Sequence, residues 1–184
     1  AGFPQPGHKI KLINPETLEE IKAGEEGMIC VPENDPGLFL EYWHLPEETA
    51  KYKHNGWFFT GDYARYDSDG YLWFLGRKDD IIKSFGYRVS PYEIERVFKA
   101  HPQVNDCAVI GEVSDDKVLV VVYVLASESS INPDDLVEYG RANLASYKAP
   151  KVVYITNHFP RTKNGKILRK DINRSTATAF STIR

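Results

Sequence analysis

Cysteine, methionine and long apolar runs are all scarce in this sequence of 184 residues. Its two cysteines, Cys30 and Cys107, stand too far apart for a CxxC metal site or a disulfide framework. No apolar run approaches the roughly 20 residues of a membrane helix, which excludes a spanning protein. The net charge of −3 argues against a general nucleic-acid binder. These absences together favour a protein of the reducing cytoplasm.

The N-terminus lacks both a start methionine and a signal peptide. The first residue is Ala1, the only methionine is Met28, and the opening stretch has neither a basic start nor an apolar core. We therefore expect a piece of a longer protein. Its 42% hydrophobic and 27% charged residues are typical of a globular chain, long enough for one domain or a small domain plus part of another.

The first part of the chain, to about residue 76, has the pattern of strands and turns. Short alternating stretches stand between clusters of glycine and proline. Aromatic stretches at 57–59 and 71–74 flank a turn at 67–70, whose aspartates and glycine suit a tight reversal. This pattern predicts a hairpin and contains no long helix.

Beyond residue 76, helical and strand patterns alternate. Ser90 and Pro91 predict the start of a helix that runs to about residue 100. Further signals predict strands at 104–111, 117–125 and 152–156, a helix from about 133 to 146 and a short terminal helix near Leu168. The second strand is apolar enough to be central in a sheet covered on both faces. The predicted class is α+β, with a β-rich part followed by a small α/β sandwich.

Positive charge is concentrated in one segment, residues 148–174, which has a net charge of +7. Such a segment is usually a solvated face. It also suits a compact polyphosphate ligand, and binding of RNA is a further alternative.

Thr60, Gly61 and Asp62 follow an aromatic strand and form the first of three candidate sites. A carboxylate held on a tight glycine turn can accept hydrogen bonds from two neighbouring hydroxyls of a ribose. The same tripeptide suits an Asx turn that closes a hairpin, and taken alone it favours that structural interpretation.

The second candidate is the charged stretch 76–88, where the β-rich part gives way to the α/β part. An exposed linker has a similar composition. Gly86, however, stands between Phe85 and Tyr87, two residues typical of strands. A glycine there indicates a bulge or a place where a ligand approaches the backbone closely.

The third candidate is Lys166, next to the pair Asn164 and Gly165. Asn-Gly is a strong hairpin signal, so a basic surface turn explains the pattern without any function. In a functional site, the Lys166 ammonium would face developing negative charge on a phosphate or carboxylate oxygen. A basic nucleic-acid loop would look similar.

Taken in order and at these separations, the segments resemble the core motifs of the adenylate-forming superfamily: acyl- and aryl-CoA synthetases, adenylation domains of peptide synthetases and firefly luciferase. The matching segments are residues 56–62, 69–72, 76–83, 86–95 and 160–166. The stretch around residue 90 is more similar to synthetases of short- and medium-chain or aryl acyl-CoA than to peptide-synthetase domains. The resemblance covers nearly the whole chain.

The resemblance implies a two-step reaction. A carboxylic acid attacks ATP to give acyl-adenylate and pyrophosphate, and a thiol then displaces AMP to give a thioester. Asp62 and Arg77 match the residues that hold the AMP ribose, and Lys166 matches the lysine that stabilises adenylation. Gly86 matches the glycine beside which the pantetheine arm of CoA passes, and Arg88 matches a basic residue near the CoA end.

The resemblance also implies a division into domains, with a hinge at Asp79. Residues 1–78 are expected to be the β-rich end of a large N-terminal AMP-binding domain, residues 79–175 the mobile C-terminal domain, and residues 176–184 a tail. The family's phosphate loop, acyl pocket and magnesium ligands have no counterpart in the sequence. We therefore expect no metal ligand in this fragment, and no activity from the fragment alone.

The implied partners are a carboxylic acid, ATP with Mg²⁺, CoA and the rest of the protein's own N-terminal domain. Neither nucleic acid nor a membrane span is expected, and a homo-oligomer is left open. One alternative is an acyl-adenylate enzyme that loads a carrier protein. The other is a module whose basic segment binds RNA or an acidic partner, although that segment lacks the interleaved aromatics typical of RNA-binding surfaces.

Overall fold

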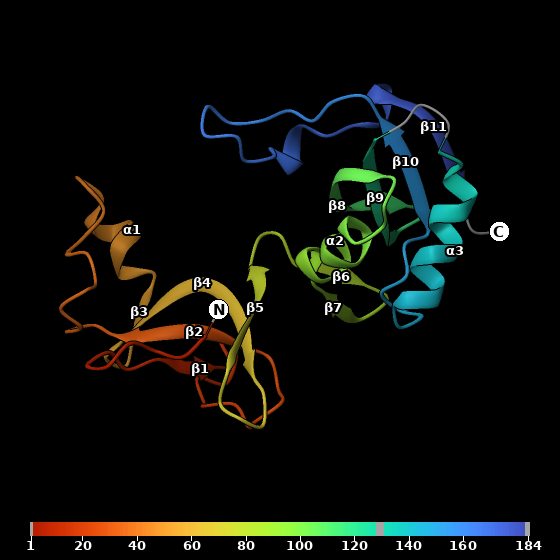
Figure 1. Cartoon of the computed structure of the whole chain (residues 1–184). Helices are drawn as coiled ribbons and strands as arrows, with labels where there is room; N and C mark the ends of the chain where they lie inside the picture. Colours follow the sequence, from red (N-terminus) through yellow and green to blue (C-terminus); the bar gives the residue numbers. More distant parts are fainter. Residues whose placement is uncertain (1, 128–130, 183–184) are drawn as a thin grey trace. The chain divides into compact units, whose positions relative to one another are not determined.

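The computed structural model describes residues 2–127 and 131–182, which divide into two compact units. The first unit ends at Asp79 and the second begins at Asp80. Both units are rich in strands and contain few helices (Figure 1), which confirms the expected mixed class. No helix within the described ranges is long and apolar enough to cross a membrane.

The first unit is one antiparallel sheet of five strands. Its elements are β1 (Lys11–Ile13), β2 (Gly27–Pro32), α1 (Pro46–Ala50), β3 (Lys53–His54), β4 (Trp57–Tyr66) and β5 (Leu72–Arg77). The long strand β4 is central, because it pairs with β2, β3 and β5, while β1 extends the sheet beyond β2 (Figure 1). A small core of Leu12, Ala64 and Leu72 joins β1, β4 and β5.

The predicted hairpin between the two aromatic stretches is confirmed as β4 and β5. Asp67 Oδ1 accepts hydrogen bonds from the backbone N–H groups of Asp69 and Tyr71, at 3.0 and 2.9 Å. The turn is thus closed by the side chain of its first residue, as aspartate-rich turns commonly are. This closure sets the register in which the two strands pair.

The second unit combines a four-stranded sheet, a small hairpin and two helices. Its elements are β6 (Ile82–Ser84), β7 (Tyr87–Val89), α2 (Pro91–Lys99), β8 (Val104–Ser114), β9 (Lys117–Ala126), α3 (Pro133–Asn143), β10 (Val152–Thr156) and β11 (Ala177–Thr182). The sheet order is β11-β10-β9-β8, with β9 and β10 parallel and the other neighbours antiparallel. The hairpin of β6 and β7 is a separate two-stranded sheet.

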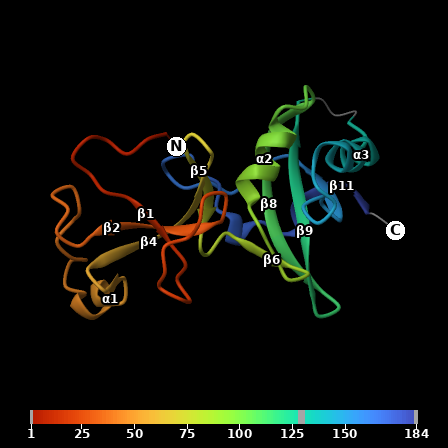
Figure 2. The same ribbon diagram turned by 90° about the horizontal axis from the view of Figure 1, so that it is seen from below.

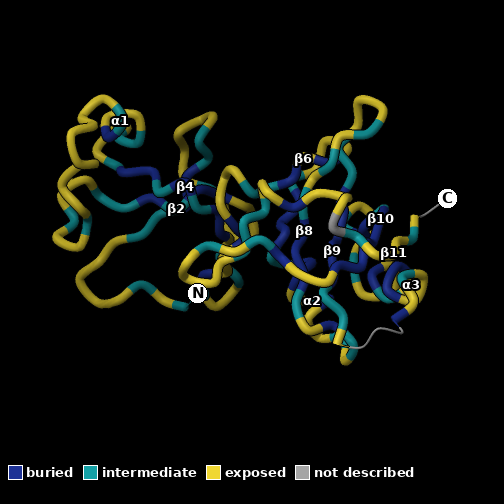
Figure 3. The backbone as a smooth tube through the Cα atoms, turned by 90° about the horizontal axis from the view of Figure 1, so that it is seen from above, coloured by how far each residue is buried: buried dark blue, intermediate teal, exposed yellow. Residues whose placement is uncertain are grey.

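Strand β9 sends alternate side chains into two different cores, because successive strand residues point to opposite faces. Val120, Val122 and Val124 join the core beneath α2 and α3 (Figure 2). Val121 and Tyr123 join the core on the other face, which the C-terminal segment covers. Much of β8 and β9 has the buried colour in Figure 3. The prediction of a central strand covered on both faces is confirmed.

Both long helices begin where the sequence predicted. Ser90 Oγ accepts a hydrogen bond from the Glu93 N–H at 3.3 Å and caps α2, whose first residue is a proline. Asn132 caps α3 in the same way, through the Asp134 N–H at 3.1 Å. Helix α2 ends within one residue of its predicted end, and α3 ends at Asn143, earlier than the predicted residue 146 or so.

The C-terminal region departs most from the expectation. Residues 177–182 of the expected tail form β11, which pairs antiparallel with β10, and the helix expected near Leu168 is only a 3₁₀ turn at Arg169–Asp171. The strand contains Thr178, Phe180 and Thr182, residue types that favour strands, in alternation with alanine and serine. It is held in the sheet by its pairing with the buried strand β10.

Candidate functional site

Asp62 and Arg77 are direct partners in the register of β4 and β5. Arg77 Nη1 donates to Asp62 Oδ1 at 3.1 Å. The Asp62 side chain is 31% exposed and that of Arg77 is 54% exposed, so both keep polar atoms that a ligand can reach. The pair therefore offers a carboxylate acceptor and a planar donor side by side, a combination that can hold neighbouring hydroxyl groups.

Thr60 and Gly61 fix the backbone before Asp62. Thr60 Oγ1 accepts from the Asp62 N–H at 3.2 Å and donates to the carbonyl of Ile29 in β2 at 2.9 Å. Gly61 has a φ of +81°, and a Cβ there would lie 3.2 Å from Arg77 Nη2. A larger residue would be strained and would crowd the guanidinium. Asp62 thus stands inside β4 on an anchored backbone rather than in a turn that closes a hairpin.

Asp79 is exposed and ends the first unit, in a short turn after β5. The Lys78 N–H donates to the carbonyl of Gly61 at 2.7 Å, which ties the end of β5 back to β4. The next residue, Asp80, begins the second unit and lies 3.7 Å from Arg169, measured from Oδ2 to Nη1. The two adjacent aspartates therefore belong to different units.

Gly86 lies in a two-residue turn between β6 and β7. Both turn residues have a left-handed backbone, with φ of +49° at Phe85 and +82° at Gly86, as tight hairpin turns require. The bulge considered from the sequence is therefore a hairpin turn instead. The sequence did not indicate it, because an aromatic residue is unusual at a positive φ. A Cβ at Gly86 would meet nothing within 4 Å, so the space beside this backbone is open.

Aromatic and basic side chains adjoin this turn. Tyr87 and Tyr147 stack with ring centroids 4.6 Å apart, and they are 54% and 41% exposed. Lys148 lies over the Tyr147 ring and pairs with Glu93 at 2.6 Å. Burial opposes the charge on Lys148, but the Glu93 carboxylate outweighs it and the pKa of the ammonium is raised. Arg88, two residues after Gly86, is half-buried in β7.

Lys166 follows a tight turn that is stabilised by hydrogen bonds within the same loop. The Gly165 N–H donates to the Thr162 carbonyl at 2.9 Å, and the Thr162 N–H donates to the Lys166 carbonyl at 2.8 Å. Arg161 donates to the Gly165 carbonyl at 2.8 Å and pairs with Asp106 of β8. The Lys166 side chain is exposed, and its ammonium pairs with no described residue. An available cation is thus presented on a fixed turn.

Half of the cations in the basic segment 148–174 are neutralised by acids of other elements. The four ion pairs are Lys148–Glu93, Arg161–Asp106, Arg169–Glu95 and Arg174–Glu112. Of the remaining cations, Lys163, Lys166 and Lys170 lie close together along the chain. The available charge is therefore concentrated around Lys166.

The buried Glu95 and the half-buried Arg169 form an ion pair that the sequence analysis did not identify. Glu95 is 6% exposed; it accepts from Arg169 Nη2 at 2.9 and 3.0 Å and from the Val109 N–H at 3.0 Å. Burial raises the pKa of Glu95, although Arg169 and the Val109 N–H act to lower it. The sequence did contain a signal, because Glu95 shares the buried stripe of α2 with Pro91 and Phe98. A charge on such a stripe needs a buried partner.

The predicted residues thus occupy three places. Asp62 and Arg77 adjoin in the first unit, Gly86 and Arg88 share one hairpin of the second, and Lys166 stands in a loop of its own. In residues 2–127 and 131–182, no group of three or more His, Cys, Asp or Glu could hold a metal ion.

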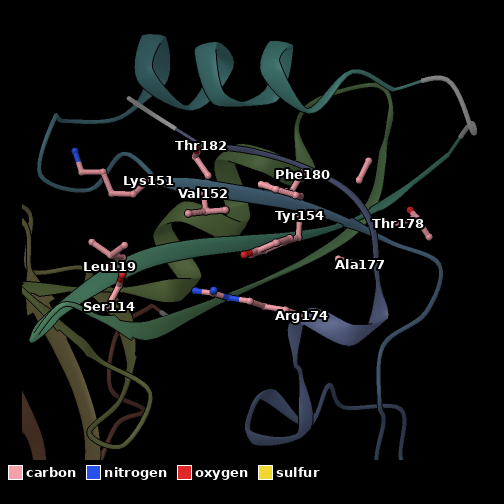
Figure 4. Close-up of a pocket in the computed structure, with 11 residues that line it drawn as sticks. Ser114, Leu119, Lys151, Val152, Tyr154, Arg174, Ala177, Thr178, Phe180 and Thr182 are labelled. Atoms are coloured by element: carbon pink, nitrogen blue, oxygen red, sulfur yellow. The ribbon is translucent and has the colours of Figure 1, made fainter.

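A groove of about 670 Å³ lies on the second unit, apart from these residues (Figure 4). It is lined by side chains of β9, β10 and β11, including Leu119, Tyr154 and Phe180, together with Lys151 and Arg174. Arg174 is already paired with Glu112 at 2.7 Å. None of Gly86, Arg88 and Lys166 lines the groove, so it is not part of the sites above.

A family model and several known proteins match this chain. Residues 93–166 match the AMP-binding enzyme C-terminal domain. The chain is 36% identical over 172 residues to a long-chain-fatty-acid–CoA ligase of Escherichia coli O157:H7, a match that covers 93% of this chain and 30% of the relative. It is 39% identical over 177 residues to a feruloyl-CoA synthase of Amycolatopsis, covering 95% and 35%.

Solved structures show the same arrangement of elements. The O-succinylbenzoate CoA synthetase of Bacillus subtilis, in complex with AMP, superimposes with a TM-score of 0.86 at 28% identity. That match covers 96% of this chain and 36% of the synthetase. The chain spans about a third of the length of the curated relatives it matches.

Proposed function

Starting from residues 93–166 as an AMP-binding enzyme C-terminal domain, we propose that the chain is the C-terminal part of an acyl-CoA synthetase. The whole protein would join a carboxylic acid to CoA in two steps, with ATP consumed to AMP and pyrophosphate. One observation carries the proposal: the available ammonium of Lys166 on a braced, exposed turn. A cation presented on a braced turn can stabilise negative charge that develops on a reacting oxygen.

Lys166 would act in the first step, in which a carboxylate oxygen attacks the α-phosphorus of ATP and pyrophosphate leaves. Negative charge is shared among the carboxylate and phosphate oxygens during this displacement, and a single ammonium can donate to both. The turn from Thr162 to Gly165 and the Arg161 contacts hold the backbone in place beforehand. Little reorganisation is then needed when the reaction occurs.

Asp62 and Arg77 would hold the ribose of the nucleotide. A carboxylate accepts hydrogen bonds from two neighbouring hydroxyls, which are the 2′- and 3′-hydroxyls in ATP and in the acyl-adenylate. Arg77 already donates to Asp62 at 3.1 Å and so orients the carboxylate before any ligand arrives. Because the ribose is present in both steps, this pair would serve both.

Gly86 and Arg88 would act in the second step, when the thiol of CoA reaches the acyl-adenylate. The open space beside Gly86 suits the passage of a thin pantetheine arm along the backbone. Arg88 lies two residues farther along the hairpin and would attract the phosphates at the other end of CoA. Since Lys166 and Gly86 stand on different loops, the second unit would turn about Asp79 between the steps.

The proposal also covers the carboxylic acid substrate, the binding of Mg²⁺ and the cellular compartment. Relatives named for a fatty acid and for ferulate match equally well, so we propose a carboxylic acid without choosing between aliphatic and aryl types. The chain has no cluster in its described ranges for Mg²⁺, which would be bound with ATP by the remainder of the protein. Two buried, unpaired thiols, Cys30 and Cys107, suit a reducing compartment such as the cytoplasm.

The test separates the two half-reactions in the full-length enzyme. Lys166→Ala should lower ATP–pyrophosphate exchange by roughly 10²–10³, the usual effect of removing a donor at a developing charge, and should spare thioester formation from supplied acyl-adenylate. Gly86→Leu should do the reverse, because a side chain would fill the open space. Equal damage to both steps by either variant would contradict its role. Accumulation of acyl-adenylate without a CoA thioester would instead indicate a carrier protein as acceptor.

A further inference from the structure

Arg169 stands three residues after Lys166 and connects several elements of the second unit. Its Nη2 donates to both carboxylate oxygens of Glu95 in α2, at 2.9 and 3.0 Å. Its Nη1 lies 3.7 Å from Asp80 Oδ2 at the start of the unit. Its guanidinium carbon lies 4.7 Å from the centre of the Tyr92 ring. One side chain therefore joins the Lys166 segment to α2 and to the residue after the proposed hinge.

This ion pair is poorly suited to be a simple stabilising contact. The side chains of Arg169 and Glu95 are 20% and 8% exposed, and Arg169 Nε is buried without a hydrogen-bond partner among the described residues. Two partly buried charges with an unsatisfied donor seldom add stability over an apolar pair of the same volume. What the pair supplies is geometry, because a planar guanidinium fits both oxygens of a carboxylate in a fixed orientation.

We propose that Arg169 is a positioning residue for Lys166, an inference that rests on the proposed function of Lys166. Three residues span at most about 10 Å, so a fixed guanidinium at 169 limits where the Lys166 backbone can lie. The other arm of the loop is held by Arg161, which pairs with Asp106 of β8. Lys166 is thus placed between two anchored arginines, each attached to a different element of the unit.

The contact with Asp80 extends this positioning to the boundary between the units. Asp80 directly follows Asp79, the proposed hinge, and faces the same guanidinium that holds Glu95. The start of the second unit and the Lys166 segment are therefore linked through one side chain. We expect a rotation at Asp79 to carry the Lys166 segment with it, which would matter for the adenylation step and not for the thioester step.

The experiment measures both half-reactions of full-length Arg169→Gln. We expect ATP–pyrophosphate exchange to fall about 10- to 100-fold, since displacement of a reacting group by about 1 Å can have an effect of this size. Thioester formation from supplied acyl-adenylate should stay within about twofold of wild type, because Lys166 does not act there. The exchange rate of Arg169→Lys should lie between those of Arg169→Gln and wild type, because lysine keeps the charge but lacks the planar fork.

Arg174→Gln is the matched control. Arg174 also pairs with a glutamate, Glu112 at 2.7 Å, and lies over a tyrosine, Tyr154 at 5.9 Å. It lies farther from Lys166 along the chain, and its partners belong to β8 and β10 and not to α2. We expect its exchange activity to equal that of wild type. A loss as large as that of Arg169→Gln would overturn the inference.

Combined variants distinguish positioning from general damage. If Arg169 acts through Lys166, Lys166→Ala with Arg169→Gln should be no slower in exchange than Lys166→Ala alone. Multiplied losses, or equal losses in both half-reactions, would overturn the inference. Glu95→Gln, which keeps the shape of the partner, gives the same test should Arg169→Gln not fold. If Lys166→Ala spares adenylation, the proposed function fails; if it impairs adenylation and Arg169→Gln does not, only this inference fails.

Discussion

Cys30 and Cys107 should be almost inert to alkylation while their units are folded. Each thiol is fully buried, and one lies in each unit. Burial raises the pKa of each thiol from 9.0 to about 12. At about pH 8 the reactive thiolate fraction is then roughly 10⁻⁴ instead of 10⁻¹, so each native thiol should react at least about 10³ times more slowly than in an unfolded peptide.

The same shift determines how stability depends on pH. A thiol whose pKa is raised by folding contributes stability that is fully present below the unfolded value of 9.0 and is lost as the pH rises through about 12. Three pKa units correspond to about 4 kcal/mol of unfolding free energy per thiol at the upper limit. The urea midpoint should therefore fall as the pH rises from about 8 to 11. In Cys107→Ala, the midpoint of the second unit should fall less steeply with pH.

Brief iodoacetamide pulses on the 184-residue chain at increasing urea concentrations, followed by peptide mass spectrometry, test the reactivity. Because each unit contains one cysteine, labelling of Cys30 reports the first unit and labelling of Cys107 the second. The expected protection would be refuted if, in the absence of urea, either thiol were alkylated at a rate within about tenfold of the rate for an unfolded peptide.

Two substitutions test the packing of the second unit. In Gly140→Ala, the new Cβ would lie 3.0 Å from the Phe98 ring and 3.1 Å from Pro150. The overpacking cost of about 1–3 kcal/mol should exceed the helix gain of about 1 kcal/mol, so urea midpoints should fall, and a rise would contradict the packing. Ser90→Ala removes the cap of α2 and should lower unfolding free energy by about 1 kcal/mol; an unchanged thermal midpoint would argue against the cap.

Local signals in the sequence were sufficient for several elements. The turn at Asp67 and the capped start of α2 at Ser90 depend on hydrogen bonds within a few residues, so their residue types predict them. Strand β10 was predicted over 152–156 because a buried strand is mostly apolar. In each case the determining interaction is either close in sequence or contained in the hydrophobic pattern.

Features that depend on distant partners could not be predicted in this way. Strand β11 contains threonines and a phenylalanine that favour strands, but whether they form one depends on the edge of β10 with which they pair. The pairing of Asp62 with Arg77 depends on the register of two strands, which shifts between Tyr63 and Ala64 at an irregularity. Similarly, nothing near Arg169 in the sequence indicates Glu95, because 74 positions separate the two.

The boundary after Asp79 has a consequence for protein engineering. Each unit is a single continuous stretch of sequence, so the chain passes from one to the other once. A graft between this chain and a relative would then need only one junction, and Lys166, Arg169 and Gly86 would be transferred together with the residues that contact them. The recipient would keep its own residues at the positions of Asp62 and Arg77, which we propose to hold the ribose. Under the proposed function, such grafts would combine the acid preference of one enzyme with the Lys166 and Gly86 loops of another.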